Sequence, residues 1–253
     1  MLHTVSIGTP SDRLPPVVIA HGLFGSARNW GVIAKRLSKD RHVIAVDMRN
    51  HGDSPQYDRH TYPSMADDLA QVIAAHGGTV DLVGHSMGGK AAMVCALAHG
   101  GIDRLVVADI APVGYSHTQQ GLIDAMQALD LDQIDTRTDA DAALAVHVDD
   151  PTIRAFLLQS LDVRGKRWRL NLDALTADMD AIIGFPDVAG SFDQPTLFLS
   201  GAKSDYVLAE HRPKIKTLFP KARFAKLPNA GHWLHAEDPR GFEATLRVFL
   251  ARQ

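Results

Sequence analysis

The chain has 253 residues, of which 45% are hydrophobic and 22% charged, and its formal net charge is −3. This length and composition fit one large α/β domain or a core with a smaller insertion, and the slight negative charge gives no electrostatic reason to expect a nucleic-acid partner. A single cysteine, Cys95, excludes an intrachain disulfide, and the sequence has neither a secretory signal pattern nor an apolar run that could span a membrane, so we expect a cytoplasmic protein.

Short apolar runs alternate with helical patterns along most of the chain. The strand-like runs are Val17–Ala20, His42–Val46, Val80–Val83, Leu105–Ile110, Thr196–Leu199 and Arg223–Leu227. The helical patterns are Trp30–Ser38, Ser64–His76, Lys90–His99, Glu210–Leu218 and Pro239–Ala251. This alternation predicts a mostly parallel sheet flanked by helices, and Leu2–Ile7 is expected to add an antiparallel edge strand.

One interval, between Pro112 and about Gln194, has no strong strand signal. It contains helical stretches instead, at Thr118–Ala128, Asp139–His147, Thr152–Leu161 and Leu172–Ile183. An interval of this length is too long for a simple connection between two strands. We therefore predict a helical cap over residues 112–193, inserted into an α/β core formed by residues 1–111 and 194–253.

The stretch Gly84–Gly89 carries the clearest chemical signal. It reads Gly-His-Ser-Met-Gly-Gly and lies between an expected strand and an expected helix. Strand, Gly-x-Ser-x-Gly and helix together are typical of a nucleophile elbow, a turn in which glycines avoid steric clashes and the serine hydroxyl is exposed. Ser86 is the candidate nucleophile.

A serine nucleophile needs a base, and the chain has 13 histidines. His232 is favoured because it follows the last expected strand, on a loop with Gly231, just before the C-terminal helix. The elbow fold requires the order serine, acid, histidine, and only His235 competes for the last place.

The oxyanion hole should consist of two backbone N–H groups. One belongs to Met87, the residue after the nucleophile. The other is expected from Leu23, which follows the pair His21-Gly22 at the end of an early strand.

Two carboxylates satisfy the chain order for the acid. Asp109 ends the apolar run that starts at Leu105, and Asp205 lies in a polar turn after the run Thr196–Leu199. A carboxylate at the end of an apolar strand is costly unless it is paired or hydrogen-bonded. Either residue could instead be a turn residue, so both remain candidates.

Six ordered blocks of the chain resemble the α/β-hydrolase superfamily, and more narrowly its YbfF-type small esterases and thioesterases and their animal relatives. The blocks are His21–Ser26, Asp47–Ser54, Gly84–Lys90, Asp109–Val113, Trp168–Leu172 and Asn229–Trp233. The resemblance implies an α/β-hydrolase fold and hydrolysis of small ester or thioester substrates without a cofactor.

The resemblance also bears on the acid. In the wider superfamily the acid commonly lies three residues after the glycine that ends its strand. Here that glycine is Gly201, the third residue after it is Ser204, and Asp205 comes one place later. YbfF-like members instead take the acid from the preceding strand, which corresponds to Asp109. Ser204 then corresponds to a supporting hydroxyl near the histidine.

We therefore expect a serine hydrolase that cleaves carboxylic esters or thioesters, possibly acyl-CoA, by means of Ser86, His232 and Asp109 or Asp205. A C–C bond hydrolase with the same residues is the first alternative, and a binding protein on a hydrolase scaffold is the second. The sequence shows no cluster with metal-ligand spacing and leaves the oligomeric state open.

Overall fold

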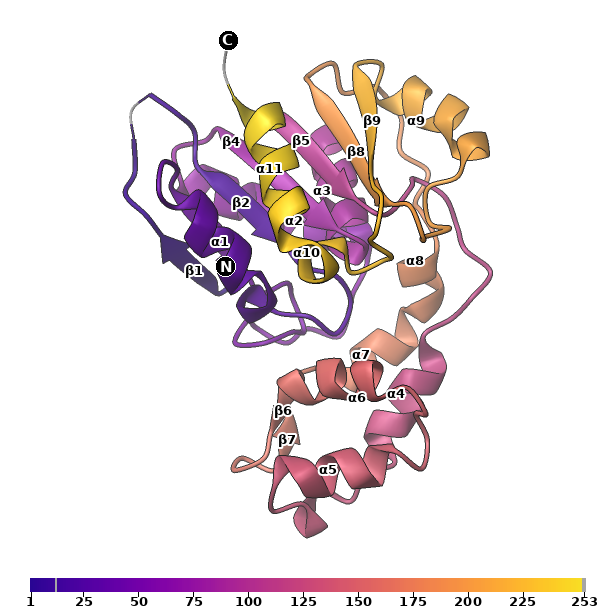
Figure 1. Cartoon of the computed structure of the whole chain (residues 1–253). Coiled ribbons are helices and arrows are strands. Elements are labelled where there is room, and N and C mark those ends of the chain that lie inside the picture. Colours follow the sequence, from indigo (N-terminus) through magenta and orange to yellow (C-terminus); the bar gives the residue numbers. More distant parts are fainter. Residues whose placement is uncertain (12, 252–253) are drawn as a thin grey trace.

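A seven-stranded sheet forms the centre of the molecule (Figure 1), in a computed structural model that describes residues 1–11 and 13–251. Its order is β1-β3-β2-β4-β5-β8-β9, and every neighbouring pair is parallel except β1 with β3. The strands are β1 (Thr4–Ile7), β2 (Val17–Ala20), β3 (Val43–Val46), β4 (Val80–His85), β5 (Ile102–Ala108), β8 (Thr196–Gly201) and β9 (Ala222–Leu227). The predicted parallel sheet and its antiparallel edge strand are confirmed.

Helices cover both faces of this sheet. They are α1 (Gly31–Leu37) and α11 (Pro239–Leu250) on one face, and α2 (Tyr62–Ala75), α3 (Met87–Ala98) and α9 (Arg212–Leu218) on the other. Alternate residues of β2 serve the two layers, because Val17 and Ile19 pack with α1 and α11 while Val18 and Ala20 pack with α2 and α3. Covered on both sides, the strand is apolar throughout. No helix in the described part of the chain combines the length and apolar character needed to cross a bilayer.

The segment between β5 and β8 forms a separate group of elements beside the sheet, drawn below it in Figure 1. Its elements are α4 (Gln120–Gln127), α5 (Arg137–Leu144), α6 (Pro151–Leu157), β6 (Leu161–Asp162), β7 (Arg167–Trp168), α7 (Leu172–Ala177) and α8 (Met179–Ile183). Two apolar clusters hold this group together, and one of them includes Phe24 from the loop after β2. We keep the name cap segment for residues 112–193; its division from the core remains a prediction.

Two elements of the cap segment differ from the sequence-based prediction. The helix expected over Leu172–Ile183 is interrupted at Asp178, whose carboxylate accepts the backbone N–H of His60 (2.5 Å) and pairs with Arg59. The helix expected over Thr152–Leu161 ends at Leu157, and the short antiparallel pair of β6 and β7 follows. Both differences depend on tertiary or cross-strand partners that no local pattern reveals.

Candidate active site

Ser86 occupies a strained turn between β4 and α3. Its backbone has φ 52° and ψ −119°, an unfavourable conformation for a residue with a side chain. Close packing explains the flanking glycines, since a Cβ on Gly84 would lie 2.3 Å from the carbonyl oxygen of Gly88. A Cβ on Gly88 would lie 2.4 Å from the carbonyl oxygen of His21. The local sequence therefore has the geometry that a nucleophile elbow requires.

His232 lies on the loop between β9 and α10 (Leu234–Glu237) and contacts Ser86. Its Nε2 is 3.1 Å from Ser86 Oγ, and its Nδ1 is 2.8 Å from Asp109 Oδ2. Because the carboxylate can only accept, Nδ1 carries the proton and Nε2 is free to accept the proton of the serine hydroxyl. The ring of Tyr206 stacks on the imidazole with centroids 4.1 Å apart.

Asp109 follows β5 directly and is fully buried. Besides His232, it accepts hydrogen bonds from Ser204 Oγ (2.5 Å) and from the backbone N–H of Gly201 (3.0 Å). These donors stabilise a carboxylate that would otherwise be costly to bury. Its φ of 52° is tolerated better by aspartate than by most residues.

Asp205 lies apart from this network. It is exposed to solvent, and no hydrogen bond joins it to His232 among residues 1–11 and 13–251. Ser204 contacts the acid rather than the histidine, since its hydroxyl donates to Asp109. Of the two carboxylates that satisfied the chain order, only Asp109 is brought to the imidazole.

Two further histidines, His235 and His85, pack close to His232. His235, the rival of His232, stacks on Trp30 with centroids 4.1 Å apart, and burial lowers the pKa of its imidazole to about 3. His85 donates its Nε2–H to the carbonyl oxygen of His232 (2.8 Å). Burial also holds the pKa of His85 well below its usual value, so this ring is a neutral donor that braces the His232 loop.

The loop after β2 runs past Ser86. A Cβ on Gly22 would lie 3.2 Å from the Cβ of Ser86, so the backbone that leads into Leu23 is close to the hydroxyl. Met87, on the other side, is the first residue of α3, whose amino end favours negative charge. The next N–H of the loop, that of Phe24, is held by His51 Nε2 (3.2 Å).

A cavity of about 280 Å³ opens beside Ser86 and is lined by both the core and the cap segment. Its apolar walls include Leu23, Met87 and Ile110 from the core and Leu122, Ile153, Phe156 and Ile182 from the cap segment. A hydrophobic group attached to a carbonyl at Ser86 would therefore be enclosed.

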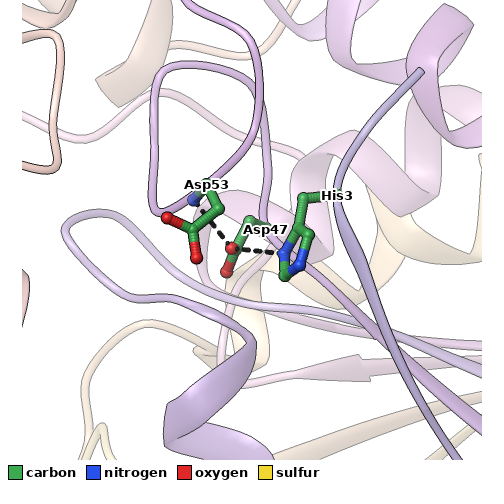
Figure 2. Close-up of side chains that lie close together, drawn as sticks. All are labelled: His3, Asp47 and Asp53. Atoms are coloured by element: carbon green, nitrogen blue, oxygen red, sulfur yellow. Dashed lines mark hydrogen bonds and ion pairs between the residues drawn. The ribbon is translucent and has the colours of Figure 1, made fainter.

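One group of side chains away from the cavity has the composition of a metal site. His3, Asp47 and Asp53 offer ligand atoms that lie within 4.8 Å of one another (Figure 2). Asp47, however, already accepts hydrogen bonds from His3 Nδ1 (2.9 Å), the N–H of Asp53 (2.9 Å) and the N–H of Ala27 (2.7 Å). Asp53 pairs with Arg169 (2.9 Å). The donor set therefore fits a hydrogen-bonded tie between the N-terminal segment and the 47–54 loop rather than a cation site.

Sequence reasoning missed Tyr206 and gave His51 no role, while for His85 it left ordering of the elbow and simple packing both open. Tyr206 follows Ser204 by two residues, but its stacking on His232 depends on how β8 and β9 pair. His51 belongs to the block Asp47–Ser54, which carries part of the family resemblance. Nothing in the local sequence, however, shows that the His51 ring accepts the backbone N–H of Phe24. None of residues 47–54 lines the cavity.

Comparisons with known proteins agree with this fold. Residues 17–245 match the alpha/beta hydrolase family. The chain is 43% identical over 251 residues to the mouse (Mus musculus) protein named sn-1-specific diacylglycerol lipase ABHD11. The matched region covers 94% of this chain and 81% of the mouse protein. It is 40% identical over 238 residues to esterase YbfF of Escherichia coli K12, with coverage of 93% and 92%.

A solved structure gives the same result for the fold. The structure of a marine microorganism esterase superimposes with a TM-score of 0.92 at 36% sequence identity, covering 98% of each chain.

Proposed function

Since this chain belongs to the alpha/beta hydrolase family, as its motifs predicted, we propose that it hydrolyses carboxylic esters and thioesters through an acyl-enzyme intermediate on Ser86. The relatives named esterase and diacylglycerol lipase support ester hydrolysis as the general activity. Thioesters belong to the same proposal because attack on their carbonyl passes through the same kind of tetrahedral intermediate.

The observation that carries the proposal is the continuous hydrogen-bonded line from Ser86 through His232 to Asp109. Its two links measure 3.1 Å and 2.8 Å, which is within the reach needed for proton transfer. A serine hydroxyl is a weak nucleophile at its own pKa, so this line is what makes Ser86 reactive.

In the first half of the reaction, Ser86 Oγ attacks the carbonyl carbon while its proton passes to His232 Nε2. Asp109 holds the imidazole in the required tautomer and stabilises the imidazolium. The N–H groups of Leu23 and Met87 donate hydrogen bonds to the negatively charged carbonyl oxygen. When the C–O or C–S bond breaks, the imidazolium gives its proton to the leaving alcohol or thiol, and the acyl group stays on Ser86.

In the second half, water attacks the acyl-enzyme and loses its proton to His232. Collapse of the second tetrahedral intermediate returns that proton to Ser86 Oγ and releases the acid. Ser204 and the N–H of Gly201 keep the carboxylate of Asp109 aligned through both steps. Apart from the attacking water, residues of the chain supply the groups that these two reaction steps need.

The test uses covalent labelling together with turnover. We expect a fluorophosphonate probe to form one adduct, located at Ser86 by mass spectrometry, and we expect hydrolysis of p-nitrophenyl esters with short to medium acyl chains. Ser86→Ala is the matched control and should lose both signals. Folded wild-type protein that neither reacts with the probe nor cleaves any ester would refute the proposal.

Parallel assays separate the narrower alternatives. Hydrolysis of p-nitrophenyl esters without hydrolysis of acyl-CoA thioesters would restrict the substrates to oxygen esters. A labelled Ser86 with poor turnover of all short esters would instead favour the C–C bond hydrolase.

A further inference from the structure

The cavity beside Ser86 contains a buried cation that the ester chemistry does not use. Lys90 lies on α3, one turn after Ser86, lines the same cavity and is 1% exposed. Its Nζ donates to the carbonyl oxygens of Ile183 (2.9 Å) and Gly184, at the end of α8. A protonated lysine has three N–H donors, so one donor remains without an acceptor among the residues that the structure describes.

No carboxylate of the described chain forms an ion pair with Lys90. The groups around it are the two carbonyls and the rings of Tyr115 and Tyr62, whose centroids lie 4.7 Å and 5.6 Å from Nζ. Burial raises the pKa of both phenols, so they stay neutral. Burial lowers the pKa of Lys90 to about 7, and the like charge of Lys214 on α9 acts in the same direction. This part of the cavity is therefore short of negative charge.

We propose that Lys90 binds a carboxylate at the far end of the acyl group, so that half-esters and half-thioesters of short dicarboxylic acids are preferred substrates. The inference rests on the proposed ester hydrolysis and specifies which acyl groups the site selects. A buried cation without an anionic partner is unfavourable, and a substrate carboxylate would supply that partner together with a charge-assisted hydrogen bond.

The placement of Lys90 suits a short chain. Ser86 precedes α3 and Lys90 lies in its first turn, about 6 Å further along the helix axis, and both line the same cavity. The wall of that cavity also includes Met87, Ile110 and Ile182, which would contact the methylene groups. The acyl carbonyl would lie at Ser86, the methylenes against the apolar wall and the carboxylate at Nζ.

Lys90 also joins α3 to the end of α8, and a purely structural role must be distinguished from carboxylate binding. Loss of a structural link would change the turnover of all substrates together. Loss of a carboxylate partner changes the ratio between an anionic substrate and its neutral analogue. The measured quantity is therefore a ratio, in which general effects on the fold cancel.

The experiment compares mono-p-nitrophenyl adipate with p-nitrophenyl hexanoate, which have acyl chains of equal length. At pH 6.5 we expect the ratio of kcat/KM, adipate over hexanoate, to fall by about 10- to 100-fold in Lys90→Met. Lys35→Met, which removes an exposed lysine of α1, is the control and should keep the wild-type ratio. An unchanged ratio in Lys90→Met would overturn the inference.

The pH dependence gives a second measurement that needs no variant. Lys90 loses its charge as the pH rises through about 7, so the wild-type ratio should decline between pH 6 and pH 8.5. The ratio for Lys90→Met should be flat over this range. A wild-type ratio independent of pH contradicts the inference even if Lys90→Met does not fold.

Binding measured without turnover separates this inference from the proposed function. Monomethyl adipate should raise the thermal midpoint of Ser86→Ala protein, and methyl hexanoate, its neutral analogue, should raise it less at the same concentration. If wild type cleaves neither p-nitrophenyl ester but monomethyl adipate still stabilises the protein selectively, the proposed function fails and the carboxylate site stands. If both p-nitrophenyl esters are cleaved and monomethyl adipate has no selective effect, the reverse holds.

Discussion

Replacement of Asp109 by asparagine is the sharpest test of how the site works. The substitution keeps the size of the side chain and the acceptor oxygen for the N–H of Gly201. It places an amide NH₂ where Oδ2 accepts from His232 Nδ1 and Ser204 Oγ. The NH₂ would donate to Nδ1 and so hold the tautomer whose proton lies on Nε2. That nitrogen faces Ser86 and could then no longer accept the serine proton.

The expected magnitude follows from the loss of the base. A wrong tautomer at a serine hydrolase site lowers kcat by about 10⁴, which corresponds to about 5.4 kcal/mol of transition-state stabilisation. KM should change little, because Asp109 is buried beneath the imidazole and does not line the cavity. The assay is steady-state hydrolysis of a p-nitrophenyl ester, with circular dichroism and a thermal melt to establish that the variant is folded.

Asp205→Asn is the matched control. Asp205 is exposed and lies outside the hydrogen-bonded network, so kcat should stay within about threefold of wild type, since surface substitutions have small effects. The reasoning would be refuted if Asp205→Asn lost activity and a folded Asp109→Asn kept it.

Three further predictions follow from the same contacts. Ser204→Ala should lower kcat by about 10- to 100-fold, since it removes a hydrogen bond to a buried carboxylate, and an unchanged kcat would contradict the supporting role. Gly88→Ala should lose stability or solubility, because the new Cβ would lie 2.4 Å from a backbone oxygen. Gly121→Ala, on α4 where the new Cβ would meet nothing within 4 Å, should raise the free energy of unfolding measured in urea by about 0.5–1 kcal/mol. Similar results for the two variants would be inconsistent with the packing. Burial lowers the pKa of His60 and His235 to about 3 each, so their contribution to the free energy of unfolding is complete above pH 6.5, the usual pKa in the unfolded chain, and declines as the pH falls toward 3. At pH 5 the free energy of unfolding should be lower by about 2 kcal/mol per histidine. Urea unfolding at pH 7 and pH 5 measures this difference, and equal stability at the two pH values would contradict the prediction.

The sheet could be predicted closely because its signals are local. The run Val17–Ala20 is buried on both faces and reads as apolar throughout, and its predicted bounds equal those of β2. The run Val80–Val83 was predicted two residues short, since β4 continues through Gly84 and His85 to the elbow. A glycine in that position resembles a strand end when the sequence is considered alone.

The cap segment was harder to predict in detail. Its helical character follows from sequence periodicity, but the break at Asp178 depends on a hydrogen bond from His60, more than 100 residues away in the chain. The hairpin of β6 and β7 has two residues in each strand, too few for an alternation pattern to be recognised.

The sequence by itself singled out the candidate nucleophile and the candidate histidine. Ser86 is set by steric constraints within six consecutive residues, where Gly84 and Gly88 leave room for neighbouring backbone, and His232 is set by its order after the last strand. Only the tertiary structure decided between Asp109 and Asp205, because β5 and β8 are neighbours and bring the N–H of Gly201 to one carboxylate while the other faces solvent. Hydrogen bonding and desolvation act through space, so which carboxylate meets the imidazole is a property of the folded sheet rather than of spacing along the chain.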